Sequence, residues 1–118
     1  MKILIVDDNR NIRKMIRSLF NAKTDQFHEC EDGNTSLEAC AVFHPDLVLM
    51  DIKMNHMDGI TATRLIKKTH PEIKIIIVTN YPHEDLWEES LKAGAETLIA
   101  KENLYLLPEI IKGVVSNI

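Results

Sequence analysis

The sequence predicts an α/β protein in which one parallel sheet carries helices on both faces. Three observations support this prediction. Short apolar runs alternate with segments of helical periodicity along the chain, and this alternation is typical of βαβ units. Most of these runs are continuously apolar, as expected of strands that are covered on both faces. A length of 118 residues suits a single domain, which we assign to residues 1–118.

The first two strand–helix units are expected within the first 43 residues. Residues 3–6 are an unbroken Ile-Leu-Ile-Val run and predict a buried strand. Residues 11–21 predict a helix, because apolar residues recur at helical spacing at Ile12, Met15, Ile16, Leu19 and Phe20. Residues 26–30 mix one Phe with polar neighbours, which indicates an edge strand. Residues 34–43 predict a second helix, whose core-facing side chains are Leu37, Ala41 and Cys40.

The next two units follow the same pattern. Residues 47–50 predict a buried strand, and residues 58–69 predict a helix that stops ahead of a Pro. Residues 73–78 are the most apolar stretch and predict a central strand. Residues 82–93 predict a helix with Pro in its first turn and Gly94 at its end.

A fifth strand at 97–100 and a fifth helix at 106–117 complete the expected fold. On the preceding helix, Trp87 and Leu91 stand four residues apart and therefore share a face. We expect Leu91 to pack in the core, and Trp87 to lie either there or at a partner surface.

Composition excludes several classes of protein. The 18 acidic and 14 basic residues give a net charge of −4, which argues against direct nucleic-acid binding. The sequence has no apolar run long enough for a membrane span or a signal peptide, and two cysteines give no disulfide framework. A cytoplasmic protein is therefore expected. Four acids around the weak second strand predict a solvated edge that resists pairing with other sheets; they are Asp25, Glu29, Glu31 and Asp32.

Polar side chains follow four of the predicted strands. Asp7 and Asp8 follow the first, Asp51 the third, Thr79 the fourth and Lys101 the fifth. Ligands of doubly wound sheets lie beyond the carboxyl ends of the strands, so we expect these side chains to share one site.

Three carboxylates in one site repel one another and need a positive partner. Lys101 is one candidate, and Mg²⁺ is the other, because it prefers carboxylate oxygens and binds together with phosphate. A carboxylate can also attack phosphorus. These residue types therefore indicate phosphoryl chemistry.

With these residues in place, the whole chain resembles the receiver domain of bacterial response regulators, the CheY-like superfamily of two-component signalling. The matching segments are residues 3–8, 45–51, Met54 with 57–59, 78–79, 91–95 and Lys101. The resemblance implies a flavodoxin-like, doubly wound, five-stranded parallel sheet of strand order 2-1-3-4-5 with five helices. It also implies that Asp51 accepts a phosphoryl group from a sensor histidine kinase.

The resemblance assigns a role to each site residue. Asp8, Asp51 and the backbone carbonyl of Lys53 would ligate Mg²⁺, with Asp7 acting through water. Thr79 and Lys101 would contact phosphoryl oxygens, and the backbone N–H groups of Lys53 and Asn80 would complete the cradle.

Phosphorylation would then change the face formed by the fourth helix, fifth strand and fifth helix. That face would bind an output partner or a second copy as a homodimer. Such a protein catalyses only its own phosphorylation and dephosphorylation, so it is not expected to be a turnover enzyme. It would serve as a stand-alone regulator, or as the receiver of a transcription regulator whose DNA-binding domain lies outside this sequence.

Three positions depart from or vary within the family pattern. Asn55 stands where Pro is usual, and Leu98 replaces the aromatic residue of the usual switch. A bulky Tyr81 beside the expected phosphoryl group predicts slower hydrolysis. The first two departures keep open an alternative, a receiver-like interaction module that works without phosphorylation.

Two enzyme-like or carrier alternatives fit less well. A dehalogenase-type phosphohydrolase needs an acid two residues after its nucleophile, where this chain has Lys53. A flavin carrier needs a Gly-rich phosphate loop after the first strand, where Asp7 and Asp8 would repel the phosphate.

Overall fold

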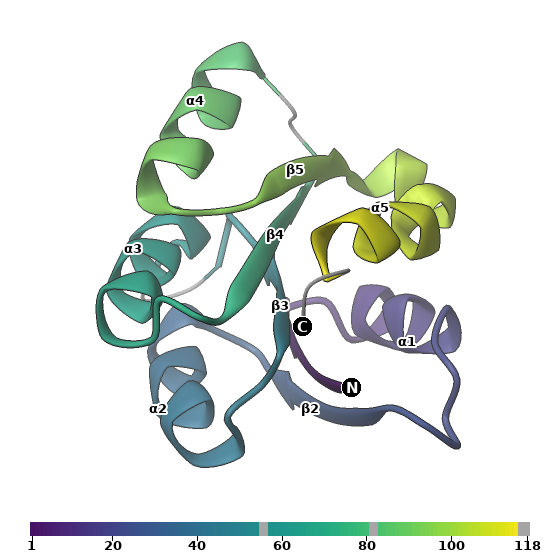
Figure 1. The fold of residues 1–118 in the computed structure, drawn as a ribbon. Helices are drawn as coiled ribbons and strands as arrows, with labels where there is room; N and C mark the ends of the chain where they lie inside the picture. Colours follow the sequence, from purple (N-terminus) through teal and green to yellow (C-terminus); the bar gives the residue numbers. More distant parts are fainter. Residues whose placement is uncertain (55–56, 81–82, 116–118) are drawn as a thin grey trace.

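All five expected strands pair in parallel in one sheet, in the order β2-β1-β3-β4-β5 (Figure 1). The structure is a computed structural model that describes residues 1–54, 57–80 and 83–115. The strands are β1 (Lys2–Val6), β2 (Gln26–Cys30), β3 (Leu47–Asp51), β4 (Lys74–Thr79) and β5 (Thr97–Ala100). The helices are α1 (Arg10–Ser18), α2 (Gly33–Phe43), α3 (Gly59–Thr69), α4 (Glu84–Ala93), the 3₁₀ helix η1 (Lys101–Leu106) and α5 (Leu107–Val114).

Helices cover both faces of this sheet. Figure 1 shows α2, α3 and α4 on one side and α1 and α5 on the other. Successive side chains of β4 alternate between these layers, so that Ile75 and Ile77 pack toward α3 while Ile76 and Val78 pack toward α1 and α5. Two buried layers on one sheet explain why the central strands are apolar throughout.

Helix faces were harder to predict than strands. Leu91 was expected in the core but is 44% exposed, and Trp87, at 43%, also faces outward. Helix α4 instead buries Ser90 and Ala93, two small residues that let the helix axis approach the sheet closely. Helix α2 likewise buries Ser36, Ala39 and Cys40, so the expected inward position of Ala41 was wrong.

The ends of two helices, α1 and α5, differ from expectation, and α4 ends where predicted. Helix α1 ends at Ser18, and Met15 is 51% exposed rather than buried. Helix α4 ends as expected at Gly94, whose φ of 107° favours glycine. A 3₁₀ turn follows β5 directly, so the last α-helix begins at Leu107. The expected starting residue Pro82 and residues 116–118 lie outside the described residues.

Candidate functional site

The expected site residues meet at the carboxyl edge of the sheet, in the order of the strands. Asp7 and Asp8 follow β1, Asp51 ends β3, Thr79 ends β4, and Lys101 begins η1 directly after β5. The parallel register places each strand end beside the next, since Asp51 is paired with Val78 and Thr79 with Ala100. The topology therefore brings together residues that lie far apart in the sequence.

Three carboxylates form the centre of this site. One oxygen from each of Asp7, Asp8 and Asp51 lies within 4.8 Å of the others. Asp7 is 1% exposed and Asp51 is 5% exposed, whereas Asp8 is open to solvent. The site therefore combines two buried acids with one that is open to solvent.

Lys101 supplies positive charge to the two buried acids. Its Nζ lies 2.9 Å from Asp7 Oδ2 and 3.4 Å from Asp51 Oδ1. Its side chain is 9% exposed, which places the ammonium inside the pocket. One ammonium therefore serves a group of three carboxylates.

This charge imbalance changes the acidity of Asp51. Burial, followed by the nearby charge of Asp7, raises the pKa of the Asp51 carboxyl to about 6, although Lys101 opposes the shift. Burial alone would lower the pKa of Lys101, but its hydrogen bonds and charge interactions with Asp7 and Asp51 together raise it. The lysine therefore stays protonated, and Asp51 is ionised at neutral pH at a cost in free energy.

Backbone groups fix the orientation of the buried carboxylates. Asp7 Oδ1 accepts a hydrogen bond of 2.8 Å from the N–H of Asn9, the residue that caps α1. Asp51 Oδ1 accepts one of 2.9 Å from the N–H of Ile52. In each carboxylate the backbone holds Oδ1, which limits how the acid can turn within the pocket.

Arg13 is a structural support of the site that the sequence interpretation missed. It is 8% exposed, and its Nη1 donates a hydrogen bond of 2.7 Å to the backbone carbonyl of Asp7. Its Nε donates one of 3.0 Å to Glu29 on β2. The sequence feature that could have pointed to Arg13 is its position between Ile12 and Ile16, on the inward side of the first helix.

Gly59 is a second residue whose role became visible only in the structure. A Cβ at this position would collide with the backbone carbonyl of Asp51. The N–H of Gly59 donates a hydrogen bond of 2.9 Å to Ile52 O, which closes the loop after β3 against that strand. Glycine is therefore needed here for close approach to the loop that presents Asp51.

The structure describes Thr79, Lys53 and Leu98 among the remaining expected residues, but not Asn55 or Tyr81. Thr79 is 2% exposed at the end of β4, and Lys53 is exposed on the loop after Asp51. Leu98 is 7% exposed and packs in the layer beneath α4. Asn55 and Tyr81 lie outside the described residues.

The donor set of the pocket fits a divalent cation. Three carboxylates offer oxygens within 4.8 Å of one another, and hard oxygen ligands of this kind suit Mg²⁺. A single ammonium leaves negative charge that such a cation would balance.

Among the described residues, no helix is long and apolar enough to cross a membrane.

Comparison with known proteins gives a consistent result. Residues 3–112 match the family described as the response regulator receiver domain. Sporulation initiation phosphotransferase F of Bacillus subtilis is 39% identical over 100 residues, covering 85% of this chain and 81% of the relative. A CheY-like receiver domain protein of Methanospirillum hungatei JF-1 superposes with a TM-score of 0.87 at 30% identity, covering 95% of this chain and 90% of that one.

Longer relatives contain the same domain as a part. The regulatory protein AtoC of Escherichia coli is 37% identical over 100 residues, which cover 85% of this chain but 22% of AtoC. The response regulator VraR of Staphylococcus aureus is 36% identical over 104 residues, or 86% of this chain and 49% of VraR. The chain thus spans half or less of these two relatives. With its fold and the family match, it belongs to the response regulator receiver domains of two-component systems.

Proposed function

We propose that residues 1–118 act as one cytoplasmic receiver domain that accepts a phosphoryl group on Asp51 from the phosphohistidine of a sensor kinase. The observation that carries this proposal is the meeting of Asp7, Asp8 and Asp51 around the ammonium of Lys101. An arrangement with excess buried negative charge is costly for the fold alone. It is useful where a metal ion and a phosphoryl group are to be bound.

In the proposed reaction, Asp51 is the nucleophile. One of its carboxylate oxygens forms a bond to phosphorus while the bond between phosphorus and the donor imidazole breaks. The imidazole nitrogen keeps the electron pair of that bond and takes a proton. Asp51 is suited to this role because its Oδ1 is held by the Ile52 N–H at the base of an open pocket.

Asp8, Asp51 and the backbone carbonyl of Lys53 would hold Mg²⁺, with Asp7 acting through water. The ion would supply positive charge to the oxygens of the transferring group. Lys101 already lies 3.4 Å from Asp51 Oδ1, so its ammonium can pair with a phosphoryl oxygen attached there. Thr79, on the strand beside Asp51, can donate its hydroxyl to a second oxygen, and the N–H groups of Lys53 and Asn80 can add to this cradle.

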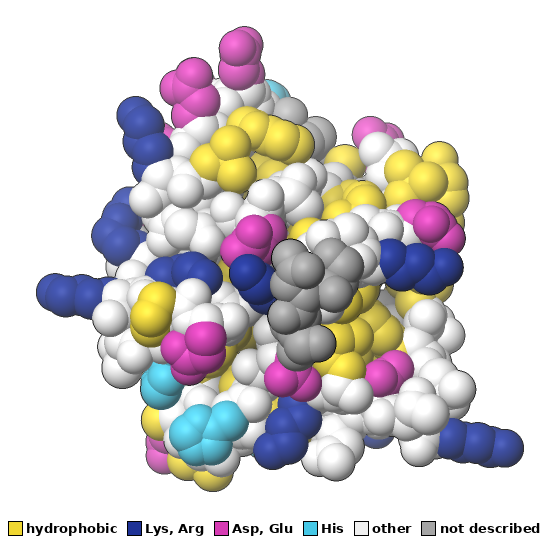
Figure 2. Space-filling model, in the orientation of Figure 1, with side chains coloured by type: hydrophobic (Ala, Val, Ile, Leu, Met, Phe, Trp, Pro, Cys, Tyr) yellow, Lys and Arg dark blue, Asp and Glu magenta, His cyan; other side chains and the backbone are white. Residues whose placement is uncertain are grey.

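Phosphorylation would act on the face formed by α4, β5 and α5. Four large hydrophobic residues on α4 and on η1, the turn that leads into α5, are exposed: Trp87, Leu91, Tyr105 and Leu106. Figure 2 shows hydrophobic surface over α4 beside β5 and again at the outer side of the η1–α5 segment. This surface suits an output partner or a second copy of the domain. Control of transcription would require a DNA-binding domain that is not in this sequence, and the receiver would turn over no other substrate.

Phosphorylation by a small donor tests the proposal. Incubation with acetyl phosphate and Mg²⁺ should add one phosphoryl group, detected by intact-protein mass spectrometry. Chelation of Mg²⁺ before the donor is added should prevent this incorporation. Asp51→Asn should reduce incorporation by about 100-fold or more, whereas Asp85→Asn, at an exposed acid of α4, should not.

The same experiment separates the two interpretations of the chain. Equal incorporation in Asp51→Asn and the unsubstituted protein would show that Asp51 is not the acceptor. No incorporation at all would favour the receiver-like module that works without phosphate.

A further inference from the structure

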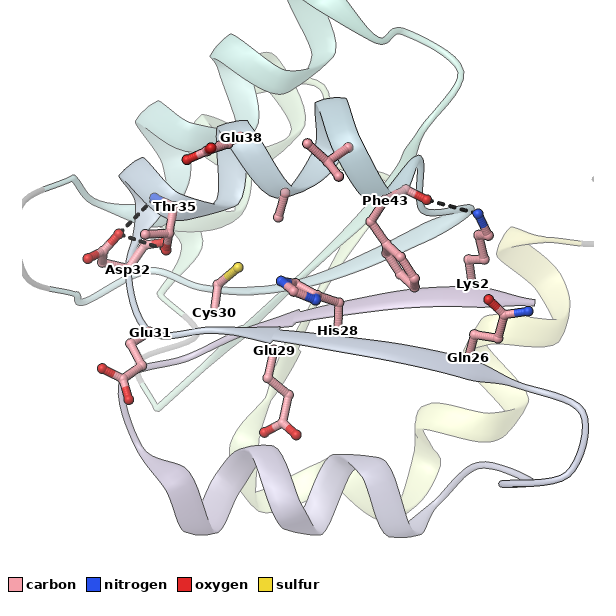
Figure 3. Close-up of a pocket in the computed structure, with 12 residues that line it drawn as sticks. Lys2, Gln26, His28, Glu29, Cys30, Glu31, Asp32, Thr35, Glu38 and Phe43 are labelled. Atoms are coloured by element: carbon pink, nitrogen blue, oxygen red, sulfur yellow. Dashed lines mark hydrogen bonds between the residues drawn. The ribbon is translucent and has the colours of Figure 1, made fainter.

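A groove of about 730 Å³ lies at the outer edge of the sheet, between β2 and α2, on the far side of β2 from α1 (Figure 3). We call it the β2–α2 groove. His28 and Cys30 of β2 point into it, and Ala39, Val42 and Phe43 of α2 form its other wall. It shares no residue with the proposed phosphorylation site.

One side of this groove is an open sheet edge. β2 is the last strand of the sheet, and within the described residues no further strand pairs with it. The N–H of Gln26 and the carbonyl of Cys30 bond toward β1, to Met1 O and Asp7 N respectively. Because backbone groups alternate along a strand, those of Phe27 and Glu29 are directed to the open side.

The half of the groove nearest the end of α2 combines the apolar side chains of Val42 and Phe43 with the polar ones of Lys2, Gln26 and His28. Val42 is 76% exposed, an unusual position for a β-branched residue in a helix beside a sheet edge. The Phe43 ring lies 5.7 Å from the His28 ring and 5.3 Å from Lys2 Nζ, and the lysine also donates a hydrogen bond to Phe43 O. This half can therefore cover an apolar side chain next to an aromatic surface.

The other half is acidic. The Glu31 side chain is 79% exposed, and Glu38 is also exposed. Asp32 caps α2 at the same end of the groove. Glu29 points away from the groove toward α1, where it pairs with Arg13 and Arg17. Arg13 Nη2 also lies 3.8 Å from Glu31 Oε1, but the Glu31 side chain is 79% exposed, so Glu31 and Glu38 stay open to a cationic ligand.

We propose that the β2–α2 groove binds an extended segment of a partner protein as a sixth strand, and that this segment carries a basic residue two positions from an apolar one. Strand addition would satisfy the open backbone groups of Phe27 and Glu29. Side chains two positions apart point to the same face, so one would lie over Val42 and Phe43 while the other would reach Glu31 and Glu38. The charge of the groove selects a basic partner.

A second copy of this chain is a poorer occupant. Residues 23–32 carry four carboxylates and one lysine, so two paired β2 edges would bring like charges together. The acidic edge predicted from the sequence thus opposes self-pairing, and the same charge attracts a cationic strand.

A blocked heptapeptide, Thr-Arg-Thr-Ile-Thr-Arg-Thr, is a direct probe because it presents the pattern in both strand directions. In amide NMR spectra of the full chain, it should cause saturable shifts at Phe27, Glu29 and Glu31, with a Kd below about 1 mM. A peptide with Glu in place of both Arg residues should lose most of this binding. A peptide with Pro in place of both the central Ile and the Thr before it should also lose it, because Pro lacks an N–H and one of these two N–H groups faces the edge in either strand direction.

Variants of the groove provide the matched test. Glu31→Lys combined with Glu38→Lys should weaken binding at least about tenfold, whereas Glu72→Lys, an exposed acid on the loop after α3, should leave it unchanged. Val42→Asp should also weaken binding without unfolding the chain, because that side chain is 76% exposed.

Three outcomes would overturn the proposal. The first is the absence of saturable shifts at β2 with the arginine peptide. The second is equal binding of the Pro peptide or of spermidine alone, which would show charge attraction without strand addition. The third is a concentration-dependent shift of the same amides without any peptide, which would identify a second copy as the occupant.

Discussion

Two acidic clusters stand on either side of β1 and are built in opposite ways. Around Glu29, Arg13 Nε lies 3.0 Å from one carboxylate oxygen and Arg17 Nη1 lies 3.0 Å from the other. At the carboxyl edge of the sheet, the ammonium of Lys101 contacts the two buried carboxylates, Asp7 and Asp51, of a group of three. The first cluster has a cation for each oxygen of its carboxylate, whereas in the second one ammonium contacts two carboxylates.

This difference indicates what each cluster does. The Glu29 cluster holds α1 against β2 and gives its charges local partners. The site cluster leaves Asp51 with a pKa raised to about 6, mainly through burial and then through Asp7. Buried carboxylates that outnumber their contacting cation are what we expect where ligands bring their own charge.

The largest expected effect on stability is at Arg13, which belongs to both clusters. Arg13→Met should lower the free energy of unfolding by about 2–4 kcal/mol, because it leaves the buried Asp7 carbonyl without its donor and removes one cation from Glu29. Urea unfolding followed by circular dichroism measures this loss. A change below about 1 kcal/mol would show that Arg13 is not a support of the site.

A smaller effect, of opposite sign, is expected at Asp51. In EDTA near neutral pH, Asp51→Asn should raise the free energy of unfolding by about 1–3 kcal/mol, because the ionised carboxylate is unfavourable in the buried pocket.

The dependence of the free energy of unfolding on pH tests the sign of this effect. The pKa of Asp51 in the folded protein lies above the 3.8 of an unperturbed aspartate, so the native state binds the proton more tightly than the unfolded chain does. The unsubstituted protein should therefore lose stability relative to Asp51→Asn as pH rises from 3.8 to about 6. If the free energy of unfolding changed in parallel for the two proteins over this range, the ionised Asp51 carboxylate would not be the destabilising group.

The smallest effect is expected at Arg17, the outer partner of Glu29. Its side chain is 55% exposed, and besides the ion pair it lies 5.1 Å from the Phe27 ring. Arg17→Met should cost less than about 1 kcal/mol, since exposed ion pairs contribute little. A loss as large as that of Arg13→Met would mean that the Glu29 pair itself, and not the support of Asp7, stabilises this region.

Much of the fold and of the site geometry was predictable because both depend on strands. Continuous apolar runs identify the buried strands, and residues directly after parallel strands must meet at one edge. Asp7, Asp51 and Lys101 were therefore expected together, and the structure places them within ion-pair distance. The strand order came from the family resemblance and is confirmed by the sheet.

The parts that were not predictable depend on close packing. Helix faces that bury Ser90 or Ala39 have small residues where hydrophobic periodicity looks for large ones. Gly59 matters because of a backbone carbonyl that lies beside it only in the folded chain. Arg13 acts through the backbone of Asp7, an acceptor that no side-chain pattern in the sequence reveals.

The most direct test of the central claim, that the site is short of positive charge until a cation binds, is thermal unfolding as a function of Mg²⁺ at constant ionic strength. We predict that millimolar Mg²⁺ raises the Tm of the unsubstituted protein by several degrees, at about 4–8 °C per kcal/mol of binding free energy. The rise should be much smaller in Asp51→Asn and in Asp8→Asn. No rise in the unsubstituted protein, or the same rise in all three proteins, would contradict this account.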